Sequence, residues 1–146
     1  MNVPMFDKVL LHKAQVIERC ISRARKEHRN AQGLFMTDLT RQDAAILNLQ
    51  RACEAALDLA QRVISRQGWG IAEISKAFFA VLRTKGVIDA TLAGTLINMV
   101  GFRNLAVHDY QELNMAIVES IILKDSSDLL TYSQQMVQQF FKTTST

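Results

Sequence analysis

The sequence has no apolar run near the roughly 20 residues that a bilayer-spanning helix needs, so we expect no membrane segment. Its first stretch, MNVPMFDKVLLHKAQ, lacks the basic region followed by a long apolar core that marks a secretory signal, which predicts a cytoplasmic protein. Only two cysteines occur, Cys20 and Cys53, and they form no CxxC pair. We expect buried free thiols in a reducing compartment, and neither a disulfide nor a metal site.

Proline is also scarce, with Pro4 as its single example, and no stretch shows the alternation of apolar and polar residues that is typical of strands. Apolar residues instead recur every three or four positions. The chain of 146 residues is long enough for one sizeable core. We therefore predict an all-α bundle of about five helices, forming a single domain over residues 1–146. The formal net charge of +3 is compatible with a nucleic-acid partner but does not establish one.

Helix-capping signals divide the chain. A first helix is expected from Pro4 to about Glu27, followed by a loop over residues 30–36. Thr37, Asp38 and Thr40 are alternative N-caps of a long second helix, which Gly68-Trp69-Gly70 ends. A short third helix should bury one face and end at Lys85-Gly86; the residues in phase on that face are Ile71, Ile74, Phe78 and Leu82.

Asp89 is the predicted N-cap of the fourth helix, whose apolar stripe is Leu92, Leu96 and Met99. A fifth helix should begin near Glu112, with a break or kink at the polar run over residues 124–128. Residues 142–146 are expected to form a frayed tail.

Two groups of charges are open to two interpretations. The first helix ends in a basic cluster, which is either a solvated helix end or a surface for an anionic partner; its members are Arg19, Arg23, Arg25, Lys26, His28 and Arg29. The second helix has a ladder of charges at three- and four-residue steps: Arg51, Glu54, Asp58 and Arg62. Structural support is the simpler interpretation of that ladder. Alternatively, Glu54 or Asp58 orients an arginine of a neighbouring helix.

That arginine is Arg103, in the stretch Met99 to Tyr110, MVGFRNLAVHDY. In a straight helix Arg103 falls within the apolar stripe, whereas Asn104 and His108 share another face about 140° away. Ile97 and Val100 lie near that second face, so we expect the helix to pack on its own core and on a second subunit. A homodimer would then place Arg103, Asn104 and His108 of both chains around one central groove.

This stretch resembles the R-x4-H-x-Y signature of the HepT-like toxins in the HEPN superfamily. The match is carried by Arg103, His108 and Tyr110, with Asn104 at a position where the family often has Asn. The run RACEAALDLA, residues 51–60, also resembles the family's second helix.

We therefore expect a metal-independent endoribonuclease that needs no cofactor, because RNA supplies its own nucleophile, the 2′-OH. His108 would act as general base or acid and Arg103 would stabilise charge on the scissile phosphate, while Asn104 orients His108 or a phosphate oxygen. The product would carry a 2′,3′-cyclic phosphate.

The resemblance implies further properties. HepT-like proteins are toxins of type II toxin-antitoxin systems and act as homodimers with a composite cleft. They are often encoded beside a nucleotidyltransferase antitoxin, MntA, which transfers AMP to the tyrosine of the motif, here Tyr110.

Two other functions remain open from the residues alone. The first is a non-catalytic helical module that binds a nucleotide or a partner protein through the same polar patch. The second is a helix-turn-helix DNA-binding protein, which is less favoured because the basic residues are dispersed rather than gathered on one recognition helix.

Overall fold

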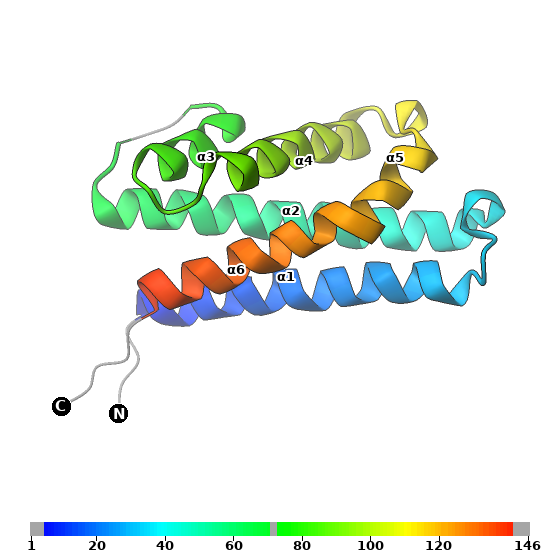
Figure 1. The fold of residues 1–146 in the computed structure, drawn as a ribbon, viewed down its shortest axis with the longest axis horizontal. Coiled ribbons are helices and arrows are strands. Elements are labelled where there is room, and N and C mark those ends of the chain that lie inside the picture. Colours follow the sequence, from blue (N-terminus) through cyan, green and yellow to red (C-terminus); the bar gives the residue numbers. More distant parts are fainter. Residues whose placement is uncertain (1–4, 71–72, 142–146) are drawn as a thin grey trace.

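The computed structural model describes residues 5–70 and 73–141, and within these ranges the secondary structure is entirely helical. Two long helices, α1 (Met5–Asn30) and α2 (Leu39–Gln67), lie antiparallel. Helices α3 (Ser75–Thr84) and α4 (Ala90–His108) pack beside α2, and α6 (Ser126–Phe140) crosses the pair α1–α2 (Figure 1). The predicted all-α bundle is confirmed. None of the helices in these ranges is long and apolar enough to cross a membrane.

The caps of α2 and α4 are largely those predicted. Of the three candidates, Asp38 is the N-cap of α2, and its side chain accepts a hydrogen bond from the backbone N–H of Arg41. Gly68 ends α2 with φ of 71°, a left-handed conformation that favours glycine. Asp89 is the N-cap of α4 and accepts from the N–H of Leu92 at 2.8 Å. The predictions for Pro4, for Ile71 on the face of the third helix and for residues 142–146 lie outside the described residues.

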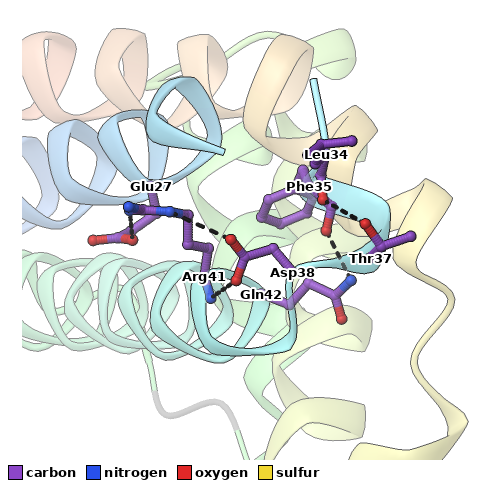
Figure 2. Close-up of polar contacts among 7 residues, drawn as sticks. All are labelled: Glu27, Leu34, Phe35, Thr37, Asp38, Arg41 and Gln42. Atoms are coloured by element: carbon purple, nitrogen blue, oxygen red, sulfur yellow. Dashed lines mark hydrogen bonds and ion pairs between the residues drawn. The ribbon is translucent and has the colours of Figure 1, made fainter. Parts of the chain in front are cut away.

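The corner between α1 and α2 is held by side chains from both helices and from the 3-10 turn Phe35–Thr37 (Figure 2). Arg41 reaches Glu27 of α1 at 2.9 Å and Asp38 at 3.5 Å. The buried amide of Gln42 donates to the carbonyl oxygen of Phe35 at 2.8 Å. Because these contacts fix the first turns of α2, they also fix the direction of Asp43, the next residue along the helix.

The phase predicted for α3 is wrong in part. Phe79 and Leu82 are the buried residues of this helix, whereas Phe78 is half-buried and Ile74 is exposed. Ile74 is the N-cap, so it precedes the helix and lies outside its periodic pattern. The phenol ring of Tyr132 from α6 meets the ring of Phe79 edge-to-face with centroids 5.6 Å apart.

The C-terminal arm, residues 115–140, begins later than the start near Glu112 that was predicted for the fifth helix. Residues 110–112 form a 3-10 turn, and α5 (Met115–Ser120) starts after Asn114, whose side chain caps it. A π-helical turn (Ile121–Asp125) joins α5 to α6, so the predicted break over residues 124–128 appears as a change of helix type.

The basic end of α1 holds this arm in place. Arg25 donates to the hydroxyl of Ser126 at 2.9 and 3.1 Å and to that of Ser127 at 3.0 Å. His28 contacts a carboxylate oxygen of Glu119 at 2.9 Å. Arg25 and His28 of the basic cluster therefore have a structural role. The structure gives no such role to the other four members: Arg19, Arg23, Lys26 and Arg29.

Cys20 and Cys53 are buried free thiols, as predicted. Burial raises the pKa of Cys53 to about 12, and the nearby Arg103 guanidinium opposes this rise.

Candidate functional site

Helix α4 carries Arg103, Asn104 and His108 of the motif on its last two turns. The predicted stripe of Leu92, Leu96 and Met99 is buried. Val100 is also fully buried and Ile97 packs against the core, so the second apolar face lies within the bundle. These two apolar residues contact their own chain, whereas Asn104 is half-buried and His108 is exposed. Contact of this helix with a second subunit through Asn104 and His108 therefore stays a prediction.

Arg103 lies half-buried on the side of α4 that faces α2, close enough to Cys53 for its charge to affect that thiol's pKa. Its Nη1 donates to the side-chain oxygen of Asn104 at 3.1 Å. Its Nε is buried and has no hydrogen-bond partner among the described residues. A buried donor without an acceptor is unfavourable, so the guanidinium is an incompletely paired cation within an apolar helix.

The alternative in which Glu54 or Asp58 orients Arg103 is not found, and these two carboxylates bond within α2 or to α1. Asp58 pairs with Lys13 at 2.8 Å and with Arg62 at 3.3 Å. Glu54 accepts a hydrogen bond from Gln50 at 2.9 Å. Both carboxylates lie on the side of α2 that faces α1, and the periodicity of α2 alone did not reveal which side α4 would occupy.

His108 is the last residue of α4, and its side chain is exposed. The described residues provide no hydrogen bond to its ring, whereas Asn104, expected to orient His108 or a phosphate oxygen, bonds to Arg103 instead. Arg103 and His108 point from different faces of α4, as the five-residue spacing predicts. One chain therefore presents a fixed cation and an exposed proton carrier that do not touch each other.

Tyr110 lies in the 3-10 turn that follows α4 and is 41% exposed. Its hydroxyl donates a hydrogen bond to Asp43 of α2. Burial of the ring, with a smaller effect of the Asp43 carboxylate, raises the pKa of Tyr110 to about 12. The contact joins the end of the motif to the start of α2 across 67 positions of sequence.

Sequence reasoning did not identify Asp43 as the partner of Tyr110. Asp43 lies three residues after Thr40, one of the alternative N-caps, and the structure uses Asp38 as the cap instead. Among residues 5–70 and 73–141, no three His, Cys, Asp or Glu side chains are grouped as a metal ion would require.

Comparison with known proteins gives a consistent result. A family model described as "Ribonuclease HepT-like" matches residues 17–136. The chain is 41% identical over 114 residues to the mRNA nuclease HepT of Shewanella oneidensis, a match that covers 78% of this chain and 85% of the relative.

Two solved structures have the same fold. One is a tri-AMPylated Shewanella oneidensis HEPN toxin in complex with an MNT antitoxin, with a TM-score of 0.85, 36% identity, and coverage of 95% of this chain and 100% of that one. The other is a toxin-antitoxin complex with AMP-PNP, also with a TM-score of 0.85 and 36% identity, covering 90% of this chain and 99% of that one.

The family match extends over most of the described bundle and includes α2 and the whole of α4 with its motif. The predicted enzyme class, an RNA-cleaving nuclease, is confirmed by this match and by the curated relative. The chain belongs to the HepT-like ribonuclease family of HEPN toxins.

Proposed function

We propose that this protein is the toxin of a type II toxin-antitoxin system and cleaves RNA in the cytoplasm without a metal ion. The proposal rests on one observation: helix α4 presents both a guanidinium with incomplete hydrogen bonding, that of Arg103, and an exposed imidazole, that of His108. An arginine fork suits a phosphate, and a histidine transfers protons near neutral pH.

The RNA and the protein together supply every group that the reaction needs. The 2′-oxygen attacks the adjacent phosphorus, the bond to the 5′-oxygen of the next nucleotide breaks, and a 2′,3′-cyclic phosphate remains. One imidazole accepts the proton of the 2′-OH, and an acid returns a proton to the departing 5′-oxygen. Arg103 stabilises the charge that builds on the phosphate oxygens, and Asn104 holds Arg103 in place.

A homodimer completes this site in the proposal. Arg103 and His108 of one chain lie on different faces of α4, so a groove lined by both motifs would offer one imidazole as base and the other as acid. Leu105 and Val107 beside the motif are 42% and 43% exposed, which gives a second copy some apolar surface to cover. Sedimentation at micromolar concentration should show a dimer, and a persistent monomer would contradict this arrangement.

The nuclease assignment is tested by digestion of a labelled RNA in the presence of EDTA, with a DNA of the same sequence beside it. We expect RNA cleavage to continue in EDTA, the 3′ ends to be cyclic phosphates, and the DNA to remain intact because it has no 2′-OH. Loss of cleavage in EDTA that added metal restores would overturn the metal-independent mechanism.

Control of the toxin is proposed to act at Tyr110, through an MntA-type nucleotidyltransferase that transfers AMP from ATP. Support comes from the exposure of the Tyr110 phenol, two residues after His108, and from the tri-AMPylated state of the similar HEPN toxin. Each attached AMP adds negative charge and bulk where the RNA backbone must enter.

Intact-mass spectrometry after incubation with the partner and ATP tests this site. We expect an AMP-sized gain that Tyr110→Phe abolishes, and a modified protein that no longer cuts RNA. If Tyr110→Phe gains the same mass, the modification lies elsewhere.

A non-catalytic helical module that binds a nucleotide or a protein through the same patch is the alternative function. It predicts that purified protein binds RNA or nucleotide without any cleavage under every condition tried.

A further inference from the structure

A groove between α1 and α2 contains Arg19 and Arg23, two of the four remaining basic residues of the α1 cluster. Its cavity measures about 540 Å³ and opens to solvent. The lining comes only from these two helices: Lys13, Val16, Arg19, Cys20, Arg23, Arg51, Glu54, Ala55 and Asp58. None of these residues belongs to the motif on α4.

The two ends of the groove differ in charge. At one end Asp58 neutralises Lys13 and the neighbouring Arg62. At the other end lie Arg19, Arg23 and Arg51, all exposed, with Glu54 as the one carboxylate there. Among the residues that the structure describes, these three arginines form no ion pair and donate no side-chain hydrogen bond. Three cations against one carboxylate leave this end positive.

The three arginines line the same groove, and all three act on one buried thiol. Cys20 lies at the floor of the groove and is 3% exposed. Burial raises the pKa of its thiol, and Arg19, Arg51 and Arg23 are the charges that oppose the rise. Their positive charges therefore add up over a small part of the groove, which is the arrangement that attracts a polyanion rather than a single carboxylate.

The groove is connected to the motif by one ridge of α2. Asp43, Leu47, Arg51, Glu54 and Asp58 follow one another at steps of four, four, three and four residues, so they share a helix face. Asp43 at the start of this ridge holds Tyr110. Arg51 comes eight residues later, about 12 Å along the helix axis at 1.5 Å per residue.

We propose that the arginine groove, defined by Arg19, Arg23 and Arg51, binds the sugar-phosphate backbone of the RNA substrate outside the cleavage site. Arginine forks match phosphate oxygens, and a nuclease substrate brings several phosphates in a row. The lining contains no aromatic side chain on which bases would stack. The groove therefore contributes affinity without sequence preference, and it extends the RNA-binding surface beyond the motif.

Salt-dependent binding tests the groove without depending on cleavage. The groove variant combines Arg19→Gln, Arg23→Gln and Arg51→Gln. The control variant removes the same charge from exposed positions outside the groove, with Arg29→Gln, Lys76→Gln and Arg83→Gln. Both are placed in a His108→Ala background, and binding to an unstructured fluorescent 20-nucleotide RNA is followed by anisotropy over a range of NaCl concentrations.

Each phosphate contact on a single strand contributes about 0.7 to the slope of log K against log salt, so losing three should reduce the slope by about 2. The corresponding loss of affinity is about 100-fold at 0.1 M salt and vanishes towards 1 M. The control variant should change the slope by less than about 0.5. Equal slopes for the two variants would overturn the proposal, because net charge alone would then explain the binding.

Cleavage assays separate this proposal from the proposed function, on which it rests. In the otherwise unaltered enzyme, the groove variant should raise KM for the 20-nucleotide RNA at least tenfold and leave the turnover of a dinucleotide unchanged. If the original protein cuts no RNA, the proposed function fails, while the anisotropy result still decides the groove. Unchanged RNA binding together with lost binding of the partner nucleotidyltransferase would refute the groove as an RNA site and assign it to that protein.

Discussion

Replacement of His108 by alanine should remove catalysis and leave the fold almost unchanged. The side chain is exposed, ends α4, and receives no hydrogen bond from the described residues. Surface changes of this kind usually alter the free energy of unfolding by less than about 0.5 kcal/mol. A protonated imidazole at a helix C-terminus adds at most about 1 kcal/mol through the helix dipole.

The effect on rate should be much larger. A positioned acid or base contributes about 100- to 10,000-fold, which corresponds to about 3 to 5 kcal/mol of the activation barrier. In a homodimer both imidazoles are lost, so the upper part of this range is expected. A large loss of cleavage rate together with a small change in the free energy of unfolding would therefore indicate a chemical role for His108 rather than a structural one.

The assay compares His108→Ala with His12→Ala, which changes an exposed histidine of α1 far from the motif in sequence. Initial rates on labelled RNA in EDTA and urea unfolding curves are measured for both variants. We expect His12→Ala to cut at the original rate and His108→Ala to lose at least 100-fold with an unchanged unfolding midpoint. A folded His108→Ala protein that cuts at the original rate would refute the assignment.

Three further outcomes are expected. Arg103→Ala should lower the cleavage rate by about 100- to 1,000-fold, and Arg103→Lys should recover only part of it because a lysine keeps the charge but loses the planar fork; initial rates decide this. Phenolate absorbance should show Tyr110 ionising near pH 12, and Asp43→Asn should lower that pKa towards the ordinary value of about 10. Because the pKa is raised in the folded state, the stability linked to Tyr110 is complete below about pH 10 and is lost as the pH rises through 12; urea unfolding at several pH values checks the sign. Tyr132→Phe removes a buried hydrogen bond of 2.8 Å to the carbonyl oxygen of Ala56 and should cost about 0.5 to 1.5 kcal/mol in urea unfolding.

Local signals in the sequence determined the order of the helices and several of their ends. Asp89 begins α4 and Gly68 ends α2 because a side-chain acceptor and a left-handed glycine satisfy backbone groups within a few residues of themselves. The composition of one short stretch likewise placed Arg103, Asn104 and His108 on α4 and separated their faces. These properties depend on neighbours in sequence, so the sequence by itself was sufficient.

The tertiary structure alone decided which residues meet across helices. Periodicity assigns a side chain to a face, but the rotation and register of the packed helices choose its neighbour. Arg103 therefore lies by Cys53 rather than by Glu54 or Asp58, and Tyr110 reaches Asp43. The same packing divided the basic end of α1. Arg25 bonds to the start of α6 and His28 contacts α5, while Arg19 and Arg23 face the groove beside α2.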